Sequence, residues 1–173
     1  MGSADILVDA FNRIRELSHG VVAGLTPDEL AFRVDSEANS IAWLVWHLTR
    51  IQDDHIADAA QSEQVWIAGG WAKKFGLPLD PSATGYGHRP DDVAAVLVRT
   101  GDLLTGYHDA VHARTVGYVA RLADTDLDRI VDESWDPPVS LGVRLVSVIS
   151  DDLQHVGQAA LIRGVLERRS ASR

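Results

Sequence analysis

The sequence of 173 residues contains no cysteine. This absence excludes disulfide bonds, zinc sites built on thiolates and a cysteine nucleophile within the chain. Any metal ion that the protein holds must therefore be bound by imidazole, carboxylate or water. Any reaction that needs a sulfur nucleophile must take the sulfur from a second molecule.

The sequence also lacks long hydrophobic runs and a surplus of positive charge. No stretch reaches the ~18 consecutive apolar residues typical of a membrane span. The N-terminus, Met1 to Asp5, lacks the basic and then apolar layout of a signal peptide. The 25 acidic residues outnumber the 16 lysines and arginines, and the resulting net charge of -9 repels phosphate backbones. We therefore expect a cytoplasmic protein that binds neither membranes nor nucleic acid.

Apolar residues recur at helical spacing in four long segments of the chain. No segment shows the alternation typical of a strand, and a further short helix is expected to begin at Thr26-Pro27. The pattern predicts an all-α fold, a four-helix bundle that forms one domain over residues 1–173. The four predicted helices cover residues 3–25, 40–60, 90–122 and 140–169.

A long connection, residues 61–89, separates the second and third predicted helices. Connections of this length inside a compact domain are usually functional segments or crossovers. Its aromatic residues, including Trp66, Trp71 and Phe75, indicate that it packs against the bundle. We expect a bundle with one long crossover, and a kink in the third helix at Gly101 or Gly106.

The fourth predicted helix places polar residues in the middle of its apolar face. Asp151 and His155 are four residues apart and so lie next to each other, about 6 Å along the axis. A buried aspartate is rare unless it is paired or bound to a metal, and a divalent cation would use both side chains. An ordinary hydrogen-bonded pair near the surface is the alternative. Asp152, three residues before His155, is a competing ligand.

A third candidate ligand, His47, lies between Leu44 and Ile51 at the edge of the apolar face of the second helix. Ligands from two facing helices are typical of metal sites in bundle cores, and three protein ligands leave a position open. Asp54 is a candidate to orient His47 or to line the pocket; otherwise it is a solvated acid. His55 is expected to be a packed core histidine or to lie at the pocket edge.

The other histidines and the usual enzyme motifs add little. His108 and His112 have ligand spacing, but their neighbours indicate a solvated helix face, and His19 and His88 have no supporting context. No GxSxG, P-loop, HExxH or dinucleotide-binding pattern is present.

Two helical segments together resemble the signatures of the DinB/YfiT-like metalloprotein superfamily, and the crossover residues Gly85 to His88, followed by Asp91 to Val93, resemble its actinobacterial branch. The first is Ser40 to Leu48, which ends in a histidine followed by leucine. The second is Asp151 to Gln158, a ligand, three residues and then His-x-Gly-Gln. The resemblance covers nearly the whole chain and implies that His47, Asp151 and His155 bind a divalent metal.

One position departs from the common pattern of the superfamily. Many members have histidine where this chain has Asp151, whereas the similar mycothiol-dependent maleylpyruvate isomerases use a carboxylate there. The resemblance thus favours Asp151 over Asp152 and implies a site of two histidines and one carboxylate. We expect zinc in it, with nickel as the second choice.

The resemblance implies a metal-dependent S-transferase or isomerase that uses mycothiol or a similar low-molecular-weight thiol on small electrophiles, in detoxification. Arg144, two turns before Asp151, is expected to face a carboxylate of the thiol or substrate, or else to be a surface residue. A non-catalytic metal- or ligand-binding bundle in the stress response, which would form a homodimer, is the alternative. A metal hydrolase is a third reading with less support.

Overall fold

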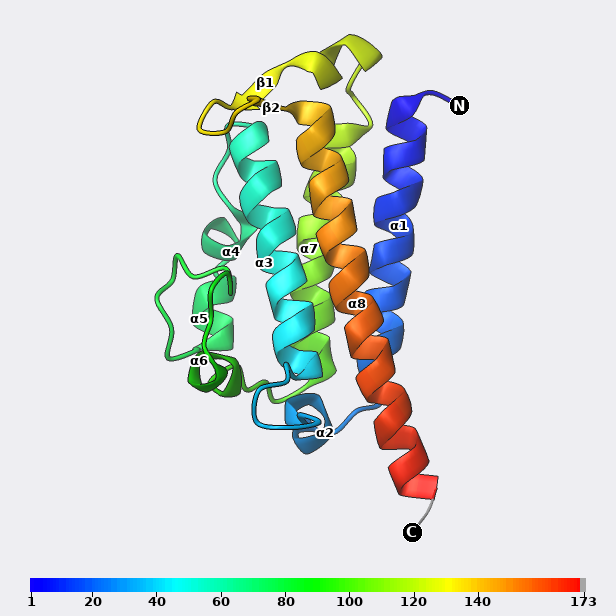
Figure 1. Cartoon of the computed structure of the whole chain (residues 1–173), viewed down its shortest axis with the longest axis vertical. Helices are drawn as coiled ribbons and strands as arrows, with labels where there is room; N and C mark the ends of the chain where they lie inside the picture. The colour runs from blue at the N-terminus through cyan, green and yellow to red at the C-terminus, as the bar shows by residue number, and fades with distance from the viewer. Residues whose placement is uncertain (172–173) are drawn as a thin grey trace.

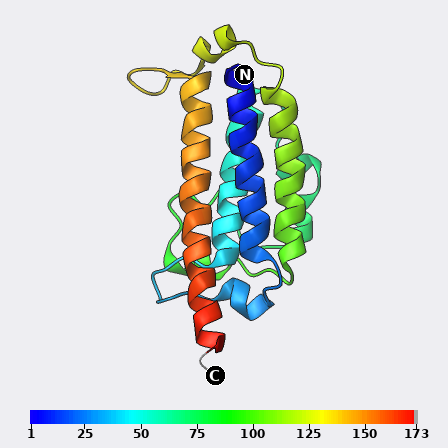
Figure 2. The same ribbon diagram turned by 90° about the vertical axis from the view of Figure 1, so that its right-hand side faces the viewer.

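Four long helices form the body of the protein in a computed structural model that describes residues 1–171 (Figures 1 and 2). Helices α3 and α1 each pack against both α7 and α8. In Figure 1, α1 and α8 run downward, whereas α3 and α7 run upward. The predicted all-α four-helix bundle is confirmed. Its helices are α1 (Ser3–Val22), α3 (Ile41–Ala59), α7 (Gly101–Val119) and α8 (Leu141–Ala171).

Two helices begin at side-chain caps that the sequence supplies. Thr26 accepts a hydrogen bond from the Glu29 amide, and Glu29 accepts one from the Thr26 amide, at the start of α2 (Pro27–Ala31). Ser40 Oγ accepts a hydrogen bond from the Trp43 amide at the start of α3. These caps satisfy amide groups that have no partner within the helix, and they set the boundary before the His47 helix.

The crossover between α3 and α7 lies on the outer side of both helices (Figure 1). It contains three short helices, α4 (Val65–Ala68), α5 (Trp71–Phe75) and α6 (Pro90–Ala94). Trp66 and Phe75 are buried against the bundle. The expectation that this segment packs rather than extends into solvent is confirmed.

A buried carboxylate, Asp53 of α3, ties the crossover to the bundle. It accepts hydrogen bonds from the amides of Val65 and Trp66, at 2.8 and 2.7 Å, and from the Tyr107 hydroxyl, at 2.8 Å. Arg50, which is also buried, donates to the carbonyl oxygen of Ala83 further along the crossover. Two buried side chains of α3 therefore hydrogen-bond to the crossover, one near its beginning and the other further along it.

The third predicted helix is wrong over its first part, since the chain leaves the helical conformation after α6 and re-enters it only at Gly101. Val96 and Val98 are both buried in the intervening segment, and this two-residue spacing is that of extended chain. A Cβ atom at Gly101 would lie 3.0 Å from the carbonyl oxygen of Val22. Gly101 thus permits a close approach to α1 and marks a helix start, not a kink.

Smaller differences occur at the two ends of the bundle. Helix α1 ends at Val22, three residues before the predicted end, and Gly24 follows with a φ of +73°. A short antiparallel pair, β1 (Ile130–Asp132) and β2 (Val139–Ser140), precedes α8. The prediction that the chain has no strand is therefore wrong. The two strands are too short to show a period in the sequence.

The apolar core consists of two clusters, one at each end of the bundle. The first is built around Leu44, Leu48, Leu104 and Ile162, and the second around Phe11, Ile14, Ile56, Val119 and Leu145. Buried polar side chains lie between them on all four long helices. Among residues 1–171, no helix is long and apolar enough to cross a membrane.

Candidate metal centre

His47, Asp151 and His155 come together between α3 and α8. One potential ligand atom from each residue lies within 4.8 Å of the other two. The two imidazole rings meet edge to face, with centroids 4.7 Å apart. His47 is 5% exposed, so the group opens to solvent mainly on the α8 side. Antiparallel packing of α3 on α8 thus joins residues that lie more than a hundred positions apart in the chain.

The crossover fixes the orientation of the His47 ring. Its Nδ1 donates a hydrogen bond to the carbonyl oxygen of Thr84, at 2.6 Å, and its ring stacks on Trp43 with centroids 4.5 Å apart. Gly85 follows Thr84 with a φ of +98°, and a Cβ atom there would collide with His47 Nδ1. Because Nδ1 carries the proton, Nε2 keeps the lone pair that a metal requires.

The helix itself orients His155. Its Nδ1 lies 2.8 Å from the backbone carbonyl oxygen of Asp151, one turn earlier, and therefore donates to it. The Nε2 atom of His155 then also carries a lone pair. Asp151 Oδ2 is buried, forms an ion pair with His155 Nδ1 at 3.3 Å and accepts no hydrogen bond from the described residues. A buried carboxylate oxygen without a partner is costly in free energy unless a cation or donor meets it.

The charges of the three residues are coupled. Burial lowers the pKa of His47 and outweighs its hydrogen bond to Thr84, so this ring is neutral near pH 7. Burial opposes the ionised forms of Asp151 and His155, but their mutual attraction outweighs it. The pKa of Asp151 is therefore lowered and that of His155 raised. A cation would replace the proton of His155 as the partner of the Asp151 carboxylate.

These donors fit a divalent ion of borderline character. Two imidazole nitrogens and one carboxylate oxygen are ligands that zinc commonly takes, and three protein ligands leave a position for a further molecule. The buried oxygen of Asp151, which accepts no hydrogen bond within residues 1–171, and its convergence with His47 and His155 favour a cation over an ordinary hydrogen-bonded pair. The competing residue, Asp152, is fully buried on the core face and is not part of the group.

Two residues near His47 had no signal in the sequence. His88, from the crossover, accepts a hydrogen bond from Trp43 Nε1 at 3.1 Å through its Nδ1, and it stacks on Trp46. Thr84 supplies the carbonyl oxygen that orients His47. A backbone acceptor leaves no trace in residue type, and only the positive-φ glycine beside it, Gly85, indicates a close approach.

Asp54 and Arg144 lie two turns from the metal group, toward the β1–β2 end. Asp54 accepts a hydrogen bond from the Gln64 side chain at 2.6 Å, so it orients the crossover and not His47. Arg144 donates to Asp132 of β1 at 2.7 Å and to His55 Nδ1 at 2.9 Å. The carboxylate that Arg144 faces in the structure is therefore internal. His55 is partly buried at this edge, where burial and then the Arg144 charge lower its pKa.

The interpretation of His108 as part of a solvated face is wrong. The side chain is fully buried, and its Nδ1 lies 3.1 Å from Thr49 Oγ1. His112, one turn later, is half-buried and contacts Asn12. His19 lies 2.8 Å from Asp109. Leu104, four residues before His108, and Val111, three residues after it, both belong to the apolar core. His108 therefore lies on the core-facing side of α7.

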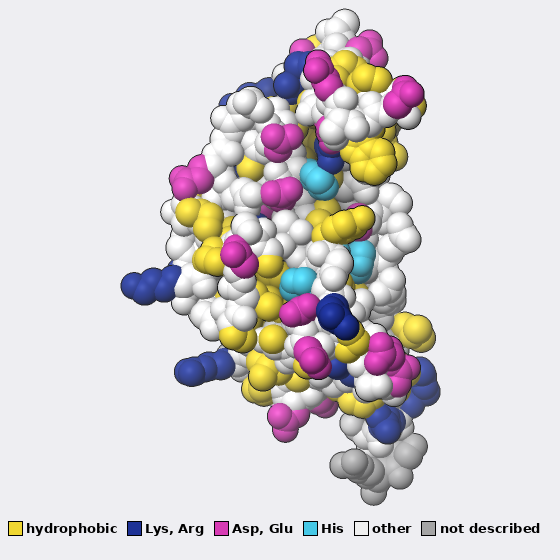
Figure 3. Space-filling model, turned by 60° about the vertical axis from the view of Figure 1, so that its left-hand side comes forward, with side chains coloured by type: hydrophobic (Ala, Val, Ile, Leu, Met, Phe, Trp, Pro, Cys, Tyr) yellow, Lys and Arg dark blue, Asp and Glu magenta, His cyan; other side chains and the backbone are white. Residues whose placement is uncertain are grey.

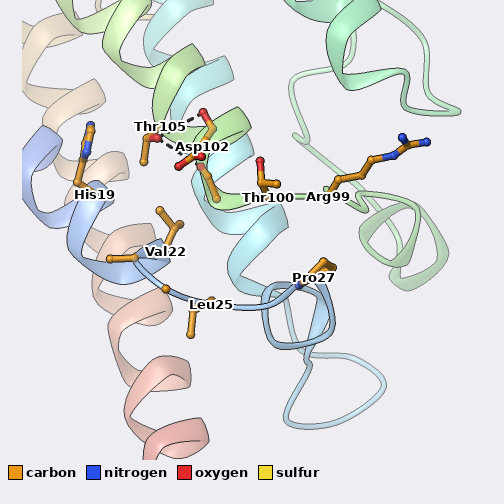
Figure 4. Close-up of a pocket in the computed structure, with 11 residues that line it drawn as sticks. His19, Val22, Leu25, Pro27, Arg99, Thr100, Asp102 and Thr105 are labelled. Carbon is orange, nitrogen blue, oxygen red and sulfur yellow. Dashed lines mark hydrogen bonds between the residues drawn. The ribbon is translucent and has the colours of Figure 1, made fainter.

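The metal group is separate from a hollow at the α1–α2 end of the bundle. Figure 3 shows the left-hand face of the molecule, where histidine side chains reach the surface beside acidic ones. A cavity of about 420 Å³ lies instead where the end of α1, the start of α2 and the start of α7 meet (Figure 4). His19, Arg99, Thr100 and Asp102 are among its lining residues, and none of the three candidate ligands is.

The bundle, the crossover and the histidine–carboxylate group define the chain as a DinB-like helical protein. Residues 6–168 match the family described as Mycothiol-S-transferase. The chain belongs to this family. The crystal structure of a conserved protein from Enterococcus faecalis is similar to it, with a TM-score of 0.88 and 31% sequence identity over 94% of this chain and 96% of that one. No curated protein matches the chain.

Proposed function

We propose that the protein is a metal-dependent S-transferase that joins a low-molecular-weight thiol, mycothiol or a close analogue, to small electrophiles in detoxification. The observation that carries the proposal is the convergence of His47, Asp151 and His155 in a chain of the mycothiol S-transferase family. The chain has no cysteine, so the reacting sulfur must come from a cosubstrate.

Each of the three residues has a defined part in holding the ion. His47 and His155 offer Nε2 because their Nδ1 atoms donate to backbone carbonyls. Asp151 offers a buried carboxylate oxygen that accepts no hydrogen bond from the part of the chain that the structure describes. A bound divalent cation, zinc in our proposal, lowers the pKa of a coordinated thiol so that thiolate is present near neutral pH. Trp43, packed against both rings, limits the access of water to them.

Metal binding is tested by elemental analysis of protein purified without chelator. We expect close to one equivalent of divalent metal in the wild type and a loss of most of it in His47→Ala and His155→Ala. Asp151→Ala is expected to lose more metal than Asp152→Ala, because only Asp151 belongs to the group. A wild type without metal would contradict the proposed site, and a larger loss in Asp152→Ala would reassign the third ligand.

Transferase activity is tested by mixing the metal-loaded protein with mycothiol and an aryl chloride. A carbon–sulfur bond forms, chloride leaves, and the thiol proton passes to solvent. We expect conjugate formation in the wild type and not in His47→Ala. Metal binding without conjugation of any low-molecular-weight thiol would instead support the non-catalytic bundle.

We further propose that Asp54 and Arg144 contact the cosubstrate at the rim of the site. Their side chains are 38% and 14% exposed, and they lie on the two helices that supply the ligands. Arg144→Lys keeps the charge but loses the forked geometry toward His55 and Asp132. We expect Asp54→Asn and Arg144→Lys to raise KM for the thiol with little change in kcat. A change in kcat alone would remove them from the binding role.

A further inference from the structure

A layer of buried polar side chains crosses the centre of the bundle, between the two apolar clusters. It takes one residue from each long helix: Ser18, Gln52, His108 and Asp152. Each is at most 1% exposed. On α1, α3 and α8, members of one apolar cluster precede the polar residue and members of the other follow it, whereas on α7 His108 lies between Leu104 and Val111 of the first cluster. The four residues therefore interrupt the inward-facing apolar stripes of all four helices.

Contacts between neighbouring helices place three of these residues at a common level. His108 of α7 contacts Thr49 of α3, one turn before Gln52. Arg15 and His19 of α1, which flank Ser18, both contact Asp109, the residue after His108. Ser18, Gln52 and His108 thus lie within about one helical turn of one another along the bundle axis.

The fourth residue joins this level through the metal group. Asp152 follows Asp151, and His155, the partner of Asp151, lies against His47 of α3. Asp152 itself points to the core side of α8, between Val148 and Val156, which belong to different apolar clusters. The metal group and the polar layer therefore occupy two sides of the same turn of α8.

Several polar atoms of the layer lack a hydrogen-bond partner among the described residues. Five buried atoms have no hydrogen-bond partner within the described part of the chain: Ser18 Oγ, Gln52 Oε1, His108 Nε2 and both carboxyl oxygens of Asp152. Each buried polar atom left without a partner costs free energy. Four helices contribute to the set, so it extends across the whole bundle.

The positions of the hydrogens in this layer show which kind of partner its polar atoms lack. Thr49 Oγ1 donates to the carbonyl oxygen of Val45, so His108 Nδ1 must donate to Thr49, and His108 Nε2 is a bare acceptor. Thr115 donates in the same way to the carbonyl oxygen of Val111 and accepts from Gln52 Nε2. Gln52 Oε1 is thus a second bare acceptor. These two atoms therefore need a hydrogen-bond donor or a cation as their partner.

We propose that the centre of the bundle is an internal solvent site, in which one or more ordered water molecules bridge Ser18, Gln52, His108 and Asp152. A water molecule donates two hydrogens and accepts others, so it serves the two bare acceptors and the Ser18 hydroxyl together. A metal cation accepts lone pairs only, and it would leave the Ser18 hydroxyl hydrogen without an acceptor. The site is separate from the metal group and does not depend on thiol chemistry.

A crystal structure of the metal-loaded protein at high resolution tests the site directly. We expect a density peak about 2.7–3.2 Å from His108 Nε2 and from at least one oxygen of Gln52 or Asp152. Direct hydrogen bonds among these side chains, with no density between them, would overturn the proposal.

Magnetic relaxation dispersion of water nuclei tests the site in solution, because it counts water molecules with long residence times. Asp152→Asn keeps a polar group in the layer and should keep the long-lived water. Asp152→Leu and Ser18→Val should lose it. Val148→Ala, one turn away in the apolar core, opens space without polar partners and should gain none. An unchanged count in both polar-to-apolar variants would overturn the proposal, as would a wild type without long-lived water.

A third measurement distinguishes a water molecule from a bound ion as the occupant of the layer. The thermal midpoint of the wild type is compared in sodium, potassium and choline chloride at equal ionic strength. Equal midpoints are expected for a site filled by water. A rise specific to one cation, absent in Asp152→Asn, would show that the layer holds an ion and would overturn the proposal.

Discussion

Gly85 is the residue whose size controls the approach of the crossover to the metal group. Its φ of +98° already disfavours other residues, and a Cβ atom would collide with the nitrogen of His47 that donates to Thr84. We expect Gly85→Ala to disturb the hydrogen bond that orients the ring and to lower metal affinity about 10- to 100-fold. Isothermal titration with the metal measures the change.

Gly87 provides the control for this substitution. It also has a positive φ, +73°, but a Cβ atom there has no neighbour within 4 Å. Gly87→Ala therefore imposes backbone strain without the collision, and its metal affinity should stay close to that of the wild type. Equal losses in the two variants would attribute the effect to strain in the loop.

The buried His108 makes the stability of the protein depend on pH. Burial, and then the nearby charge of His112, lowers its pKa to about 3, from 6.5 in the unfolded chain. Between these values the unfolded state binds the extra proton, so the free energy of unfolding falls as the pH falls. The slope is about 1.4 kcal/mol for each pH unit.

Comparison with His108→Gln isolates this contribution, because the other groups titrate in both proteins. Asp152, whose pKa burial raises, contributes a slope of opposite sign. Between pH 6.5 and 5, we expect the wild type to lose about 2 kcal/mol more of its free energy of unfolding than the variant. Urea denaturation at matched metal content measures both. Parallel curves would mean that folding does not lower the pKa of His108.

At the level of elements, the crossover is held by one carboxylate. Asp53 accepts three hydrogen bonds within the protein and lies 3.8 Å from the Arg50 guanidinium. Asp53→Asn puts an amide NH₂ where donors already point, and we expect it to cost about 3 kcal/mol of unfolding free energy. It should also weaken metal binding, because the crossover carries Thr84.

Asp54 is the matched control for Asp53. It is the next residue along α3 but is 38% exposed, with one hydrogen bond from Gln64. Asp54→Asn should cost less than about 1 kcal/mol, since exposed pairs contribute little. Chemical denaturation of the two variants, followed by metal titration, compares them. A larger effect of Asp54→Asn would show that the crossover is held from its solvent side.

The long helices were predictable because each shows an apolar stripe at helical spacing, with caps such as Thr26 and Ser40 at the starts. The convergence of His47 with the Asp151–His155 pair followed from the facing apolar stripes and from the family resemblance. The break before Gly101 was not predictable, because Val93, Val96 and Leu97 recur at helical spacing in the sequence. Val96 and Val98 are instead buried in non-helical chain, and Gly101 comes close to Val22 at the distant end of α1.

At the level of the whole molecule, the proposed metal contributes to stability by mass action. With free metal at one hundred times its Kd, binding adds about 2.7 kcal/mol. For a protein of this size, removal with chelator should lower the thermal midpoint by roughly 5–10 °C. Scanning calorimetry checks this, with His47→Ala as the control, whose midpoint chelator should leave unchanged. An equal fall in both proteins would mean that the ion acts elsewhere.

The position of the three candidate ligands on α3 and α8 has a mechanical consequence. An ion held between these helices ties together positions about 100 residues apart, as a disulfide does in chains that contain cysteine. The crossover, α7 and the β1–β2 pair then form a closed loop, while α1 lies outside it. A molecule pulled from its two ends could release α1 and the far end of α8, yet the enclosed segment would extend only after the ion is lost.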